Sequence, residues 1–213
     1  MSDLSGVIRS ERLALIDYLE TLGPEQWAAR SLCTAWTVQD VAAHLAWAPV
    51  MGIGESLGGL ARSGLRINAF IADSAVRAAT RGTDAILDQL RANARSGATP
   101  IGMPPIAALG DAVVHPLDIR RPLDSHRPIP AEAFAPTADF FAHTRWPASV
   151  PVGGSVVRRI RGLRLVATDV DWAHGRGAEV RGTAEALMLV LAGRPVHAGE
   201  LTGPGAAVLH TRL

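Results

Sequence analysis

The sequence contains no lysine and a single cysteine, Cys33, among its 213 residues. The absence of lysine excludes Schiff-base chemistry and a lysine general base. One cysteine cannot form an intrachain disulfide or a zinc site with several cysteine ligands, so nothing indicates an oxidising compartment. Any catalysis must therefore depend on other side chains.

The chain also lacks an excess of either charge and any long apolar run. Its 21 basic and 20 acidic residues give a formal net charge of +1, without the basic face that is typical of nucleic-acid binding. It has no run of 18 apolar residues, and residues 1–6 do not resemble a signal peptide. Because 48% of the residues are hydrophobic, the chain can bury a core. We expect a cytoplasmic monomer or homodimer that binds neither nucleic acid nor a membrane.

The first half of the chain is predicted to form a helical bundle. Apolar residues recur there at three- and four-residue spacings, and glycine or proline interrupts the patterns. Helices are expected over residues 4–22, 38–50, 67–95 with a break near Gly82, and 106–115. A glycine-rich stretch, residues 52–64, separates the second helix from the third. Four helices joined in this way favour a bundle.

Two helix boundaries in this half have clear local signals. Thr37 suits the N-cap position of the second helix, and Asp40, three residues later, completes a variant of the capping box. In the fourth helix, Pro116 removes a backbone donor and disfavours helical geometry at His115. We therefore expect that helix to kink or end at Pro116, with a possible restart there.

The composition changes after Pro122. Three prolines mark residues 123–136 as a linker. The elements expected beyond it are a helix at 138–145, strands at 163–167 and 179–181 around a turn at 172–177, a helix at 184–192, and a last helix or strand to Leu213. The predicted fold class is α+β, with a four-helix bundle over residues 1–125 and a small α+β domain over 138–213.

Three polar side chains of the bundle have the spacing of a metal site. Asp111 and His115 are four residues apart, so on a helix both lie on one face and can reach one ion. His44, at the edge of the apolar stripe of its helix, can supply a third ligand. These donors suit zinc as well as iron, nickel or manganese, and leave positions for water, a thiolate or substrate. The same spacing also fits histidines with a purely structural role.

Asp118 is a competing carboxylate, because on a continuous helix it lies three residues from His115. We expect Asp111 to be the ligand, since a break at Pro116 would move Asp118 off the shared face. The expected partner of Asp118 is an arginine: Arg120, Arg121 or one of the second domain.

The remaining reactive side chains are interpreted as structural. Cys33 has no histidine or basic residue adjacent in sequence, so it is predicted to be a buried small hydrophobe. The histidines without paired spacing are assigned to the surface or to caps: His126, His143, His174, His197 and His210.

Two segments resemble the mycothiol-dependent maleylpyruvate isomerase family, within the wider DinB-like group of metal-binding helical bundles. The first is Cys-x-x-Trp-Thr-Val-x-Asp-Val-x-x-His-Leu over residues 33–45, and the second is His-x-x-Asp-Ile-Arg-Arg-Pro-Leu over residues 115–123. The likeness continues through residues 167–172, 175–177, 180–182 and 191–194 and covers nearly the whole chain.

The resemblance implies a zinc ion held by His44, Asp111 and His115, with mycothiol as the thiol that binds it. A metal-bound thiol loses its proton at neutral pH and is a strong nucleophile. In the isomerases the thiolate adds to the double bond of a cis-dioic acid, a single bond rotates, and elimination returns the trans isomer. Arginines bind such carboxylates in a bidentate manner. The arginines expected to do so are Arg194, which resembles a family arginine, with Arg120 or Arg121.

The chain departs from the family pattern at Asp111, where the isomerases have a glutamate. The aspartate is shorter by one methylene, so a shift of the helix or a bridging water must make up its reach. Pro116 is a second departure. Either one can mean a different metal position, a different thiol or a lost site.

Two functions from different classes follow. The first is a metal- and mycothiol-dependent isomerase or thiol S-transferase, with a small carboxylate-bearing electrophile as substrate and the site between the two domains. The second is a non-catalytic relative that binds a small molecule or a protein partner, with a structural or lost metal site. A metal-dependent hydrolase that uses water in place of the thiol is a third hypothesis.

Overall fold

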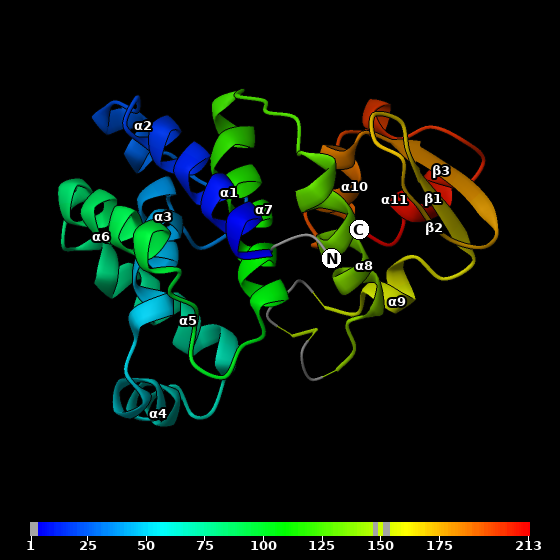
Figure 1. The fold of residues 1–213 in the computed structure, drawn as a ribbon. Coiled ribbons are helices and arrows are strands. Elements are labelled where there is room, and N and C mark those ends of the chain that lie inside the picture. The colour runs from blue at the N-terminus through cyan, green and yellow to red at the C-terminus, as the bar shows by residue number, and fades with distance from the viewer. Residues whose placement is uncertain (1–3, 147–148, 151–153) are drawn as a thin grey trace. The chain divides into compact units, whose positions relative to one another are not determined.

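The computed structural model describes residues 4–146, 149–150 and 154–213. The chain divides into two compact units, residues 1–126 and 127–213 (Figure 1). The described part of the first is helical, and the second combines helices with a three-stranded sheet, so the predicted α+β class is confirmed. Within the described ranges, no helix has the length and apolar content required to span a bilayer.

The N-terminal unit is built around α3. Its α-helices are α1 (Leu4–Leu19), α2 (Pro24–Ala28), α3 (Val38–Trp47), α4 (Ile53–Arg62), α5 (Ile67–Ala79), α6 (Thr83–Ser96) and α7 (Pro105–Arg120), with short 3-10 turns at Ala48–Val50 and Arg121–Leu123. Helix α3 packs against α5, α6 and α7, and α1 packs against α6 and α7. Apolar side chains from these helices form a common core that includes Leu15, Leu19, Val41, Ile86 and Leu90. Burial of this core is the main source of the bundle's stability.

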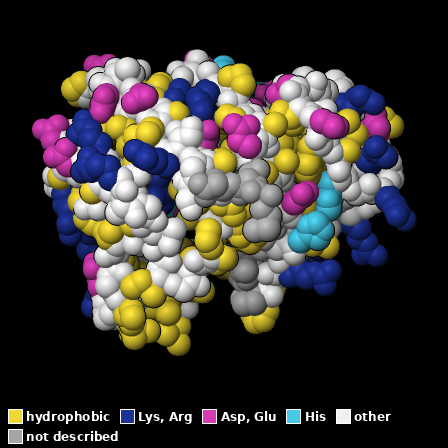
Figure 2. Space-filling model, in the orientation of Figure 1, with side chains coloured by type: hydrophobic (Ala, Val, Ile, Leu, Met, Phe, Trp, Pro, Cys, Tyr) yellow, Lys and Arg dark blue, Asp and Glu magenta, His cyan; other side chains and the backbone are white. Residues whose placement is uncertain are grey.

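The predicted break near Gly82 is confirmed, but the glycine-rich stretch is not a simple connection. Gly82 separates α5 from α6 with a φ of 89°, which glycine adopts without strain. Residues 53–62 form helix α4, where Gly59 packs so closely on Phe70 that a Cβ would overlap the ring. Apolar side chains gather on the surface over α4 in Figure 2, including Ile53 and Leu57. Tertiary packing on α5 thus stabilises a helix despite four glycines from Gly52 to Gly59.

The start of α3 confirms the predicted capping box. Thr37 has extended backbone angles, and its side chain accepts a hydrogen bond from the backbone N–H of Asp40 at 3.2 Å. In return, Asp40 Oδ2 accepts from the N–H of Thr37 at 2.8 Å. The N–H of Val38 also donates to the carbonyl of Ala29 at 2.9 Å. These bonds satisfy donors that a helix start leaves unpaired, and they fix where α3 begins.

Helix α7 continues past Pro116 to Arg120, so the predicted end at this proline is wrong. Proline removes one intrahelical hydrogen bond and usually costs about 3 kcal/mol inside a helix. The residues that follow are deeply buried, with exposed fractions of 4% for Leu117 and 0% for Ile119. Their burial compensates for the missing bond, since each large apolar side chain contributes about 1.5–3 kcal/mol when buried.

The C-terminal unit packs helices beside a small mixed sheet. Its elements are α8 (Ala131–His143), α9 (Val156–Arg159), β1 (Leu163–Ala167), β2 (Ala173–Gly175), β3 (Ala178–Gly182), α10 (Ala184–Leu191), a 3-10 turn (Ala198–Glu200) and α11 (Ala206–His210). The strand order is β2-β1-β3, and β1 is antiparallel to β2 and parallel to β3. Helix α10 packs against α8, β1 and β3.

The sequence patterns predict most elements of this unit correctly, but the predictions for two segments are wrong. The strand over 163–167 and the helix that follows Thr183 are confirmed. The linker over 123–136 is wrong in its second part, because α8 begins at Ala131 and includes Pro136. The segment 172–177 was predicted as a turn, but it contains β2, whose pairing with β1 no local pattern reveals.

Thr37→Ala is expected to lower the free energy of unfolding by about 1 kcal/mol, because the first turn of α3 loses its side-chain acceptor. Urea denaturation followed by circular dichroism measures the change. Thr80→Ala is the matched control, since the exposed Thr80 hydroxyl only donates to the carbonyl of Arg77 at the end of α5. Equal effects of the two substitutions would contradict a specific role for the cap.

Candidate metal site

The three side chains predicted as metal ligands lie together in the N-terminal unit. His44 comes from α3, and Asp111 and His115 come from successive turns of α7; one donor atom of each lies within 4.8 Å of the others. The Nε2 atom of His115 is 4.0 Å from Asp111 Oδ1. Donor atoms around a tetrahedral zinc ion lie about 3.4 Å apart, so only a small contraction is needed to bind one ion.

The surroundings of His44 favour its neutral form. Burial inside the bundle, and then the positive charge of His115, lower the pKa of His44 to about 3. The two imidazole rings meet edge to face with centroids 5.1 Å apart. Trp36 packs against both, with its ring centroid 5.3 Å from that of His44 and 6.3 Å from that of His115. His44 is therefore deprotonated at neutral pH, as a metal ligand must be.

His115 is held through its other ring nitrogen by a fully buried carboxylate. Its Nδ1 atom lies 2.9 Å from Oδ2 of Asp118, a side chain with no exposed surface. Burial lowers the pKa of His115, but the hydrogen bonds to Asp118 and Cys33, together with the negative charge of Asp118, outweigh this effect and raise that pKa to about 10. Since a carboxylate can only accept, Nδ1–H donates to Asp118 and Nε2 faces Asp111.

Cys33 contacts the same carboxylate, which sequence reasoning missed. Its Sγ atom lies 3.1 Å from Asp118 Oδ2, and it is partly exposed rather than a buried apolar side chain. The loop that carries it is fixed to α7 by a hydrogen bond of 3.0 Å from the N–H of Leu32 to the carbonyl of Asp118. Cys33, His115 and Asp118 also form a second group whose donor atoms are within 4.8 Å of one another. The structure thus shows Oδ2 of Asp118 with Cys33 and His115, and the expected arginine partner of Asp118 stays a prediction.

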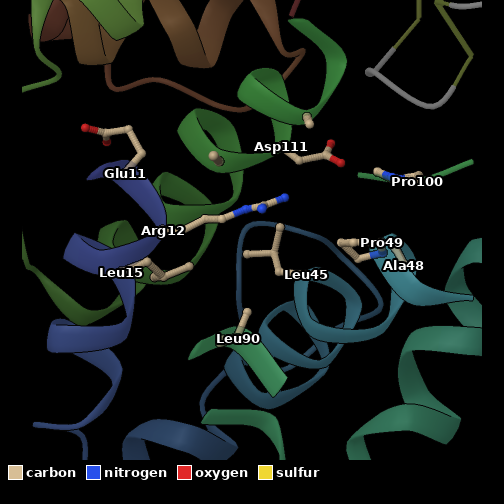
Figure 3. A pocket seen from close by; sticks show the side chains of 11 residues that line it. Glu11, Arg12, Leu15, Leu45, Ala48, Pro49, Leu90, Pro100 and Asp111 are labelled. Atoms are coloured by element: carbon tan, nitrogen blue, oxygen red, sulfur yellow. The ribbon is translucent and has the colours of Figure 1, made fainter. Parts of the chain in front are cut away.

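A pocket opens beside Asp111 and is lined mainly by apolar side chains. Arg12 of α1 and Asp111 of α7 both line it (Figure 3). Arg12 is held by hydrogen bonds to two backbone carbonyls, 3.1 Å to Asn93 and 2.7 Å to Ala98. The Asp111 side chain remains 43% exposed. No sequence pattern indicated Arg12, because its partners are more than 80 residues away along the chain.

The arginines expected to bind substrate have other contacts in the structure. Arg120 stacks on Tyr18, with its guanidinium carbon 3.7 Å from the ring centroid, and donates to the carbonyl of Ala14. Arg121 lies beside His126, at 3.4 Å between Nη1 and Nδ1. The third, Arg194, belongs to the C-terminal unit, where Nη1 donates to the carbonyl of Ala192 at 3.2 Å. Their catalytic roles remain predictions.

Comparison with known proteins finds a match to one family model and similarity to one known fold. Residues 8–100 match the family model of the mycothiol maleylpyruvate isomerase N-terminal domain. Similar solved structures include the mycothiol-dependent maleylpyruvate isomerase and a histidine-to-alanine mutant of it, each with 14% identity, a TM-score of 0.61, and coverage of 96% of this chain and 92% of the other. No curated protein sequence matches the chain significantly. The family match includes His44 but ends before Asp111 and His115. Only the geometry of the structure associates these two residues with His44.

Arg12→Met is expected to lower the free energy of unfolding by about 1–3 kcal/mol, because two carbonyls lose a charged donor. Thermal or urea unfolding measures the loss. Arg9→Met, at an exposed position of the same helix, is the control and should have little effect. Equal stability of the Arg12 and Arg9 variants would show that the two hydrogen bonds contribute nothing.

Proposed function

Because residues 8–100 of this chain match the family model of the mycothiol maleylpyruvate isomerase N-terminal domain, we propose that the protein is a metal- and thiol-dependent enzyme. Its metal ligands are His44, Asp111 and His115. The observation that carries the proposal is the convergence of these donors from α3 and α7. The reaction is an isomerisation or a thiol S-transfer on a small, carboxylate-bearing electrophile.

The donor set fits a divalent ion, with zinc the proposed metal. Two imidazoles and one carboxylate are common zinc ligands, and three protein ligands leave a position for a thiol. The carboxylate of Asp111 reduces the net charge of the complex. When bound, such an ion supplies Lewis acidity, which favours the thiolate form of a coordinated thiol at neutral pH.

The continuity of α7 supports Asp111 as the third ligand despite its short side chain. An unbroken helix keeps Asp111 and His115 one turn apart on the same face, and their donor atoms are already 4.0 Å apart. The chain therefore does not require a glutamate at position 111 to bring a carboxylate oxygen close to the ion that His115 would bind. Asp111 also lines the pocket that contains Arg12, and its side chain is 43% exposed, so this ligand is accessible from solvent.

The thiol is proposed to be mycothiol, as the family name implies. Such a thiol would supply the nucleophile for attack on an activated double bond or for displacement of a leaving group, and the carboxylate of the substrate would need a positively charged partner. Arg194 is the proposed partner, because it resembles an arginine of the family, with Arg120 or Arg121 assisting. A planar guanidinium can bind such a carboxylate through two hydrogen bonds.

Metal analysis is the direct test. Untagged wild-type protein, reconstituted with zinc and dialysed, is expected to retain about one equivalent of metal. His44→Ala should retain less than about a tenth of an equivalent while its circular dichroism is unchanged. His197→Ala is the control, since it removes an exposed imidazole from the C-terminal unit. Wild-type protein without metal under these conditions would favour a non-catalytic relative instead.

Thermal unfolding with added thiols tests the second half of the proposal. A ligand that binds only the native state raises the melting temperature by mass action. Mycothiol is expected to stabilise the zinc-loaded wild-type protein but neither the metal-free protein nor His44→Ala. Stabilisation by zinc without any effect of mycothiol would retain the metal site and reject thiol dependence.

Asp111→Ala is expected to reduce metal affinity more than Asp118→Ala. Loss of a direct ligand should cost more than about 100-fold, whereas residues that only contact a ligand typically contribute about 10–100-fold. Competition with a chromogenic chelator measures both affinities. If Asp118→Ala had the larger effect at comparable stability, the assignment of Asp111 as the ligand would be wrong.

A further inference from the structure

We propose that Asp118 is a positioning residue, which holds His115 through Nδ1 so that Nε2 is presented to the metal, with Cys33 as a second donor to the same carboxylate oxygen. The inference rests on the proposed metal site. It assigns a role to two side chains that are not among the three proposed ligands, and it names which nitrogen of His115 binds the ion.

The geometry fixes the direction of two hydrogen bonds at Oδ2 of Asp118. Its Oδ2 atom lies 2.9 Å from His115 Nδ1 and 3.1 Å from Cys33 Sγ. An ionised carboxylate has only acceptors, so the imidazole N–H and the thiol S–H both point toward it. When a metal replaces the second ring proton, the lone pair that binds it lies on Nε2, on the side of Asp111.

The burial of Asp118 supports a functional role beyond packing. The carboxylate has no exposed surface and lies in a helix segment that is otherwise apolar, between Leu117 and Ile119. A charge at such a position is costly unless it is hydrogen-bonded and compensated. A cation on the far side of His115 would supply compensation, because the imidazole transmits the polarisation between the ion and the carboxylate.

The loop over residues 31–37 fixes the second donor in place. The N–H of Leu32 bonds to the carbonyl of Asp118, and the N–H of Trp36 bonds to the carbonyl of Cys33 at 2.8 Å. Trp36 in turn packs against the rings of both histidines. The backbone and the side chain of Asp118 are thus tied to the same loop, which leaves the His115 ring little freedom to rotate.

The alternative is that Cys33, Asp118 and His115 are themselves ligands of an ion, because their donor atoms are also within 4.8 Å of one another. The hydrogen-bond distances around Oδ2 disfavour it, since an ion there would have to replace both donors. Cobalt can decide between the two arrangements. A cysteine thiolate bound to cobalt gives a strong charge-transfer band, whereas a site of two histidines and one aspartate does not.

The test is Asp118→Asn, which retains the size of the side chain and removes its charge. An amide can donate to the imidazole as well as accept from it, so the Nδ1–H form loses its preference. Cobalt and zinc affinity should fall about 10–100-fold with unchanged circular dichroism. The matched control is Asp88→Asn, which removes the same charge from a side chain that is 77% exposed on α6 and should change affinity less than about twofold.

Two measurements on the wild-type protein need no variant and remain available if Asp118→Asn does not fold. In nitrogen-15 spectra of the zinc-loaded protein, His115 should carry its proton on Nδ1 and the metal on Nε2. The cobalt-loaded protein, without added thiol, should lack a sulfur-to-cobalt charge-transfer band.

The outcomes separate this inference from the function on which it rests. Wild-type protein that binds no metal would overturn both. Metal binding by wild-type protein with equal affinity for Asp118→Asn would overturn only the positioning role. A proton on Nε2, or a sulfur-to-cobalt band, would also reject it while leaving a metal site in place.

Discussion

The hydrogen bond between His115 Nδ1 and Asp118 Oδ2 connects the packing of the bundle to its polar centre. It buries a carboxylate completely and determines which ring nitrogen of His115 faces Asp111. A buried charge without partners would destabilise the fold by several kcal/mol, and the imidazole of His115 and the thiol of Cys33 are two of the partners that stabilise Asp118 there. The arrangement of the proposed ligands follows from this one pair.

The pair exists only because α7 remains a helix through Pro116. Asp111, His115 and Asp118 lie on successive turns, and a break at the proline would separate the last two. Local chemistry favours the break, since proline lacks an N–H and restricts the residue before it. Burial of Leu117 and Ile119 in the bundle opposes it, and the larger apolar contribution prevails.

The family match and the site geometry rest on different parts of the chain. The matched residues, 8–100, include His44 and the loop that carries Cys33, whereas the other proposed ligands lie on α7. At 14% identity the solved isomerase shows a common fold, and the fold brings α3 and α7 together. The convergence of His44, Asp111 and His115 on this scaffold gives the metal hypothesis physical support that their spacing alone did not supply.

The sequence by itself determined the features that depend on near neighbours. The Thr37–Asp40 capping box, the break at Gly82 and strand β1 follow from a few adjacent residues, and so does the common face of Asp111 and His115. Only the tertiary structure decided the contacts between distant segments. Cys33 meets Asp118 across 85 residues and Arg12 reaches Asn93 across 81, while burial keeps Pro116 inside a helix. No local pattern encodes such contacts, because they form when whole helices pack and bury their apolar faces together.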